Sequence, residues 1–352
     1  MRTSIYKALI TAIALVCGGN SLLLAQENGK SDNVTPGQVL DKLLERVKFT
    51  GYLQAGYAYD DEASVSTSSY NIKRAILWAD VQITDRFSAR FMYNFCSVVQ
   101  DAYLDYRITN GPELNVRVGQ FKNSFSHENP VSLTSIECIN GTSQAVSAMC
   151  GVKGDPLYGT NYGRDMGMKI FGDIFNKKFH YELAIMNGQG VNTSDGNSDK
   201  DIIVKLEFRP LTELRIVATG QKGRGHAVGT AAWNPDIEVG DNYRRDRLSF
   251  GGEWKSQLLG LRAEWLGGKD GNVDSWGAYV TGRLTVAKNI DVVASYDIYD
   301  RNKSMDYDQT NITGGIQYWF YKKCRLQLQY TRVIRQFDDD YNSIQAQFQI
   351  AF

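Results

Sequence analysis

The chain of 352 residues is long enough for two ordinary globular domains or for one large barrel. Its 39 basic and 39 acidic residues give a formal net charge of +0, so it lacks the basic excess typical of nucleic-acid-binding proteins. It contains 20 Tyr and 33 Gly but 6 Pro, which favours a protein made mostly of strands and tight turns.

The N-terminus has the pattern of a secretory signal peptide. A basic start precedes the apolar run 8–16, and a cleavage site follows at Ala25. The apolar run is too short and too close to this site to be a membrane anchor. Lipidation at Cys17 is the alternative interpretation. We predict that residues 1–25 are a signal peptide, so the mature chain leaves the cytoplasm.

The next segment, residues 26–47, begins with polar residues and then places apolar ones at helical spacing: Val39, Leu40, Leu43, Leu44 and Val47. This predicts a periplasmic N-terminal segment with one short helix, and a bare linker is the alternative. No run of about 18 apolar residues follows, so no transmembrane helix is predicted. A closed barrel could still span a membrane, because closure pairs every backbone group.

From residue 48 to residue 352 the apolar residues recur with a period of two. In the last segment Ile344, Ala346, Phe348, Ile350 and Phe352 alternate with glutamines. One apolar and one polar face over about ten residues matches a tilted transmembrane strand. A final aromatic on the apolar face resembles the C-terminal signal that the barrel-assembly machinery reads. We therefore expect Phe352 to contact that machinery.

The same alternation occurs in about sixteen segments: 49–59, 75–82, 87–94, 102–107, 114–118, 166–170, 179–185, 202–208, 214–219, 248–255, 261–265, 276–284, 290–298, 312–320, 325–330 and 344–352. An even number of strands and alternating short and long connections are typical of transmembrane barrels. A soluble β-sandwich is the alternative, but its strands would be nearer five or six residues. We predict an all-β, antiparallel transmembrane β-barrel over 48–352.

The polar faces of these segments carry charges of both signs. We predict that the pore-lining residues are Arg74, Asp80, Arg90, Asp105, Arg107, Arg117, Arg215, Arg262, Arg283 and Arg325. Because arginines and acids share these faces, we expect inward ion pairs and a modest ion preference.

Four segments resemble hallmarks of the phosphate-selective porin O and P family. They are KRAIL (73–77), RFMYNF (90–95), DAYLDYR (101–107) and LNVRVGQFKNSFSHE (114–128). The motifs are confined to residues 73–128, but the strand rhythm continues to the C-terminus. The resemblance implies a trimeric channel of sixteen strands in the outer membrane, with a third external loop folded into the lumen.

The connection 123–162 stands in the place of that third loop and is the longest in the chain. A loop of this length in a compact protein is more often functional than idle. We predict that it is a constriction loop, with His127, Glu128, Glu137 and Lys153 as its candidate residues.

Two cysteines of this loop, Cys138 and Cys150, pass through an oxidising compartment, and the sequence leaves a disulfide between them open. The spacing of the cysteines and the three histidines, at 127, 180 and 226, suggests no metal site. We predict neither a metal nor a cofactor.

The family resemblance also implies selectivity for phosphate, which such channels obtain from an arginine ladder and a lysine cluster. The loop 123–162 offers Lys153 and no arginine, and no lysine cluster is evident. The sequence therefore favours passive diffusion of small hydrophilic solutes and ions through a homotrimer in outer-membrane lipid. Preference for anions such as phosphate is an alternative.

Two other classes of function remain. A barrel hydrolase would need a histidine placed beside a serine or an acid, and no G-x-S-x-G pattern occurs. We therefore predict that the protein is not an enzyme. A closed structural or adhesive barrel would have a lumen plugged by the long loop and would show no conductance.

Overall fold

The computed structural model describes residues 45–62, 67–305 and 307–352. The predicted signal peptide and most of the predicted N-terminal helix lie outside the described residues. The chain divides into two compact units, residues 1–48 and 49–352, and the second is the barrel. Val47 was predicted to belong to the helix but instead begins the first strand.

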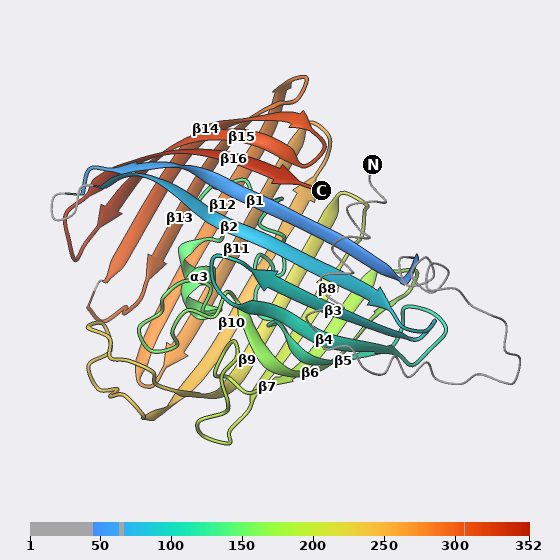
Figure 1. Ribbon diagram of the computed structural model, residues 1–352. Coiled ribbons are helices and arrows are strands. Elements are labelled where there is room, and N and C mark those ends of the chain that lie inside the picture. Colours follow the sequence, from blue (N-terminus) through green and yellow to red (C-terminus); the bar gives the residue numbers. More distant parts are fainter. Residues whose placement is uncertain (1–44, 63–66, 306) are drawn as a thin grey trace, which may run out of the picture. The chain divides into compact units, whose positions relative to one another are not determined.

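Sixteen strands form a closed antiparallel barrel in the part of the chain that the structure describes (Figure 1). Each strand pairs with its neighbours in the sequence, and the first strand pairs with the last. The strands are β1 (Val47–Asp60), β2 (Thr67–Gln82), β3 (Phe87–Asn94), β4 (Val99–Arg107), β5 (Asn115–Lys122), β6 (Arg164–Ile174), β7 (Phe179–Met186), β8 (Asp201–Phe208), β9 (Leu214–His226), β10 (Asn242–Lys255), β11 (Leu259–Asp270), β12 (Val273–Ala287), β13 (Ile290–Asp300), β14 (Asp308–Tyr321), β15 (Cys324–Arg335) and β16 (Tyr341–Ala351). The predicted fold class and strand number are confirmed.

The barrel closes between β1 and β16. Gln54 lies opposite Gln349, and Tyr57 lies opposite Ala346. Gly51 and Phe352 extend this pairing by two backbone hydrogen bonds of 3.0 and 3.3 Å. Because the ring is complete, each strand has a partner on both sides and its backbone groups are paired without help from water.

The barrel wall reverses the usual placement of polar and apolar side chains. In β15, Leu326 and Leu328 are exposed, whereas the intervening Gln327 and the following Gln329 are buried. A soluble protein would show the opposite order. An apolar outer face and a polar inner face are what a wall surrounded by lipid requires.

Short and long connections gather at opposite ends of the barrel. Turns such as 288–289 and 322–323 lie at what we call the short-turn end. The longest connections lie at the other end, the long-loop end: 123–163, 187–200 and 227–241. The last of these is shorter than the gap between the predicted segments 214–219 and 248–255, because β9 continues to His226 and β10 begins at Asn242.

The connection 123–163, which we call loop L3, lies against the inner face of the wall. Its short helix α3 (Gln144–Met149) contacts β11, β12 and β13 (Figure 1). Phe125 and Met149 of the loop pack in one buried cluster with Ile203 and Leu266 of the wall. This cluster is the main apolar core of the barrel. No helix among the described residues is long and apolar enough to cross a membrane.

Candidate functional site

Strand β11 holds the first turn of loop L3 through Glu264. This carboxylate accepts hydrogen bonds from the Ser126 hydroxyl at 2.9 Å and from the His127 backbone N–H at 2.8 Å. Ser126 has a φ of 73°, in the left-handed region that most side chains avoid. The two bonds therefore stabilise a backbone conformation that the local sequence does not favour.

Arg262, two residues earlier on the same strand, binds acids from both the loop and the wall. Its guanidinium lies 3.1 Å from Glu137 and 3.7 Å from Glu128 of loop L3, and 3.1 Å from Glu253 of β10. The Arg262 side chain is 4% exposed. A charge so far removed from water needs close partners of opposite sign, and here it has three.

Strand β15 holds the far side of loop L3, because its side chains donate hydrogen bonds to backbone carbonyls of the loop. Arg325 donates to the carbonyl of Ile136 at 2.7 Å. Gln327 and Gln329 both donate to the carbonyl of Glu137, at 2.9 and 2.7 Å. The loop is thus fixed to β11 and to β15, which lie several strands apart in the ring.

Burial changes the acid–base behaviour of the loop side chains. It raises the pKa of Glu128 to about 7, although Arg262 and the Ser143 N–H oppose the change. It lowers the pKa of Lys153 to about 8, with help from the nearby charge of Arg74, and it lowers the pKa of His127. Two of the four predicted loop residues, Glu128 and Lys153, therefore titrate near neutral pH.

The ten residues predicted to line the pore all lie on the polar face that loop L3 contacts. Most of the arginines have an acid as partner: Arg90 with Asp80 at 2.7 Å, Arg117 with Asp105 at 2.7 Å, Arg215 with Glu207 at 3.8 Å, Arg262 as above, and Arg283 with Asp291 at 3.4 Å. Arg74 and Arg325 instead donate to the amide oxygens of Gln54 and Gln317. Arg107 lines a cavity of about 390 Å³ near the short-turn end.

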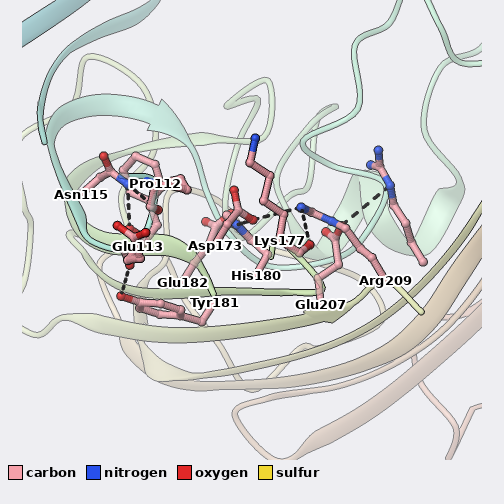
Figure 2. Close-up of polar contacts among 12 residues, drawn as sticks. Pro112, Glu113, Asn115, Asp173, Lys177, His180, Tyr181, Glu182, Glu207 and Arg209 are labelled. Atoms are coloured by element: carbon pink, nitrogen blue, oxygen red, sulfur yellow. Dashed lines mark hydrogen bonds and ion pairs between the residues drawn. The ribbon is translucent and has the colours of Figure 1, made fainter. Parts of the chain in front are cut away.

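A chain of charged side chains follows the wall near that end (Figure 2). The imidazole of His180 lies between two carboxylates, 3.0 Å from Asp173 and 3.0 Å from Glu182. Arg209 reaches Asp173 at 3.0 Å and Glu207 at 2.5 Å. Lys169 pairs with Glu182 at 2.6 Å and Arg215 lies 3.8 Å from Glu207. Three cations therefore match the three acids, and the network offers little unbalanced charge to a passing ion.

Several buried ion pairs were not among the predicted residues: Arg164 with Asp101, Lys169 with Glu182, Arg245 with Asp201, and Arg247 with Asp270. Arg245 and Arg247 lie in a part of β10 where residues 244–247 are all charged, so the alternation that predicts a strand is missing there. Their acid partners depend on the pairing of strands far apart in the sequence.

A polar cavity of about 400 Å³ remains beside loop L3. Its wall side is formed by β12 to β16, with Thr313 and Thr331 among the lining residues. Its loop side includes Glu128, Ser143 and Lys153. This part of the inner face is therefore not filled by the loop.

The two loop cysteines are free thiols in the structure, so the disulfide that the sequence left open is not formed. The Cys150 sulfur lies 3.6 Å from the carbonyl of Phe125 within the apolar cluster. Cys138 interacts with Ser295 of the wall, and burial raises its pKa to about 12. The side chains thus have separate surroundings. No group of three or more His, Cys, Asp or Glu among the described residues is placed to hold a metal ion.

Among solved structures, several outer-membrane porins are similar in fold to this chain. An anion-selective porin from Comamonas acidovorans has a TM-score of 0.63 at 14% identity, over 87% of this chain and 99% of that one. The trimer form of OmpT from Vibrio cholerae has a TM-score of 0.64 at 14% identity, over 87% and 99%. The channel DcaP of Acinetobacter baumannii has a TM-score of 0.59 at 13% identity, over 86% and 97%. At these identities the similarity establishes the fold.

Among curated proteins, none matches the sequence. The model of the family "Phosphate-selective porin O and P" matches residues 47–265, which is more than half of the chain. This match includes the four motifs and strands β1 to β10. The chain therefore belongs to the phosphate-selective porin O and P family of outer-membrane porins.

Proposed function

We propose that this porin is a passive channel for small hydrophilic solutes and ions, with loop L3 as its constriction. The observation that carries the proposal is the polar cavity of about 400 Å³ left between the loop and β12 to β16. The loop is anchored on β11 and β15, so it narrows the lumen without occupying all of it. Sixteen strands are enough to enclose an aqueous lumen.

Balanced inward charge supports a modest ion preference. Five of the eight predicted arginines have a carboxylate partner, so their fields are largely cancelled at the distance of a passing ion. Anion preference is the second candidate. Lys73, Arg74 and Lys153 influence one another electrostatically, and no ion pair is recorded for them among the described residues.

Recordings from purified protein in a planar bilayer test both candidates. We expect stepwise conductance, and a reversal potential in a KCl gradient that corresponds to a weak preference. The absence of steps would contradict a channel and favour a closed structural or adhesive barrel. A reversal potential close to the chloride equilibrium value would replace the modest preference with anion selectivity.

The ion preference should depend on pH through Glu128. Its pKa is raised to about 7, so Glu128 gains a proton as the pH falls from 8 to 6 and its negative charge is lost. We expect the reversal potential in a KCl gradient to move toward the chloride equilibrium potential as the pH falls over this range. In Glu128→Gln the same shift should be smaller, because that position no longer titrates. An equal shift in both proteins would assign the titration to another group.

The placement of the polar groups supports a channel over a hydrolase. In a serine hydrolase the imidazole must touch the nucleophilic hydroxyl. Here the Ser124 hydroxyl donates to one oxygen of Glu182, while His180 binds the other oxygen of the same carboxylate. The acid separates the two groups, so His180 cannot take a proton from Ser124.

We further propose the topology and assembly. Residues 1–25 are removed as a signal peptide, residues 26–46 form a periplasmic segment, and the short-turn end faces the periplasm. The protein assembles as a homotrimer. Its support is the fold shared with OmpT, which is described in a trimer form, and an apolar hollow of about 850 Å³ on the outer face of β14 to β16. We expect chemical cross-linking to yield trimers.

A further inference from the structure

A row of hydroxyl groups crosses five consecutive strands of the inner wall. We call this row the hydroxyl belt, and its members are Thr281 of β12, Ser295 of β13, Thr313 of β14, Thr331 of β15 and Ser343 of β16. Each member lies directly opposite the next in the strand pairing. Two pairs are hydrogen-bonded, Thr281 with Ser295 at 2.7 Å and Thr313 with Thr331 at 2.9 Å.

The belt is an uncharged stretch of a wall that is otherwise rich in charge. Beside it, Gln329 lies opposite Gln345, which adds neutral amides next to the hydroxyls. Charged residues stand at its two ends, where Arg262 pairs in register with Thr281 and Asp60 with Ser343. The belt therefore separates two charged regions.

Loop L3 presents further hydroxyls to the same cavity. Thr142 and Ser143 line it from the loop side, and each residue is only 8% exposed. Their hydroxyl oxygens have no hydrogen-bond partner among the described residues. One carboxylate oxygen of Asp297, which also lines the cavity, is likewise without a partner. The loop therefore adds polar residues to the side of the cavity that faces the belt.

The chemistry of the two faces suggests the kind of guest. A hydroxyl both donates and accepts, so it can pair with another hydroxyl in either direction. Neighbouring strands are about 4.8 Å apart, which gives the belt a regular spacing comparable with the repeat of a linear oligosaccharide. The charged groups that line the cavity, among them Glu128, Asp297 and Lys153, are of both signs, so together they favour neither anions nor cations strongly.

We propose that the cavity between the hydroxyl belt and loop L3 is a subsite for uncharged, polyhydroxylated solutes such as short oligosaccharides. The inference rests on the proposed channel function and names a substrate class for it.

The test compares wild type with the double variant Thr313→Val, Thr331→Val. Valine keeps the shape of threonine, and replacing both partners of a hydrogen bond by apolar groups is nearly neutral for stability. The double variant should therefore fold and conduct KCl as the wild type does. Thr310→Val is the matched control, because Thr310 is a buried threonine of the same strand that is not among the described residues lining the cavity.

Maltotriose is added to single channels recorded in KCl, and the concentration that halves the current is measured. We expect block of the wild type and of Thr310→Val, and about tenfold weaker block of the double variant because two hydroxyls are lost. KCl steps without any block by maltotriose would overturn the subsite but leave the channel intact. Equal block of wild type and double variant would also overturn it. A missing KCl step would contradict the channel function itself.

Potassium phosphate in place of maltotriose identifies the class of solute. We expect the effect of phosphate to be the same in the wild type and the double variant, since the belt carries no charge. A block by phosphate that is weaker in the double variant than in the wild type would contradict the assignment to uncharged solutes.

Discussion

Replacement of Arg262 by methionine should destabilise the barrel and widen the channel. Arg262 is 4% exposed and contacts Glu128 and Glu137 of loop L3 and Glu253 of β10. Its removal leaves three carboxylates close together without a cation. Breaking a buried ion pair by removing one partner costs about 3–5 kcal/mol. The repulsion among the acids acts on the loop, so the current per channel should rise and become noisier.

Two measurements check this expectation. The first is the temperature at which the folded, fast-migrating form converts to the unfolded form in SDS gels, and the second is single-channel conductance. Arg215→Met is the matched control, because Arg215 is 51% exposed and lies 3.8 Å from Glu207. Exposed pairs contribute about 0–1 kcal/mol, so this variant should resemble the wild type. Equal unfolding temperatures and currents for all three proteins would show that Arg262 does not hold the loop.

Glu264→Ala should open the first turn of loop L3. The carboxylate accepts the hydroxyl of Ser126 and the N–H of His127, and alanine leaves both donors buried without a partner. Each such loss costs about 1–3 kcal/mol. The left-handed backbone at Ser126 then has less to support it, so we expect the segment around residues 123–131 to become sensitive to proteases.

Limited proteolysis followed by mass spectrometry locates the cleavage. Glu264→Gln is the conservative comparison, because its amide oxygen still accepts one hydrogen bond. We expect the extent of its cleavage to lie between that of the wild type and that of the alanine variant. Cleavage confined to the connections 187–200 or 227–241 would argue that Glu264 does not maintain the turn.

The strands were predictable because a barrel wall has one apolar face. Each strand must present apolar side chains to lipid and polar ones to the lumen, and this gives a period of two that a single sequence displays. The pattern in Ile344 to Phe352 is the clearest case. Strand ends were less predictable. Beyond the membrane both faces of β9 and β10 are polar, so the alternation fades around His226 and Asn242 although the pairing continues.

Partners in the candidate site could not be predicted in the same way. Arg117 and Asp105 lie on consecutive strands joined by a short connection, so a pair of this kind can be predicted from the sequence. Arg262 with Glu137 joins residues from a strand and a distant loop, and their approach depends on how the loop packs. The hydroxyl belt was missed for a related reason. Thr281 and Ser343 are aligned only when four successive strand registers are known.

The pairing of β1 with β16 has a consequence for how the barrel forms. Gln54 and Gln349 are 295 residues apart in sequence, yet their side chains hydrogen-bond at 2.7 Å. Contacts of such long range form slowly, because the chain loses much conformational entropy before they contribute. Until β16 arrives, β1 is an open edge that could pair with another chain. Completion of the cylinder is therefore a late and vulnerable step, and changes at this seam should impair assembly more than permeation.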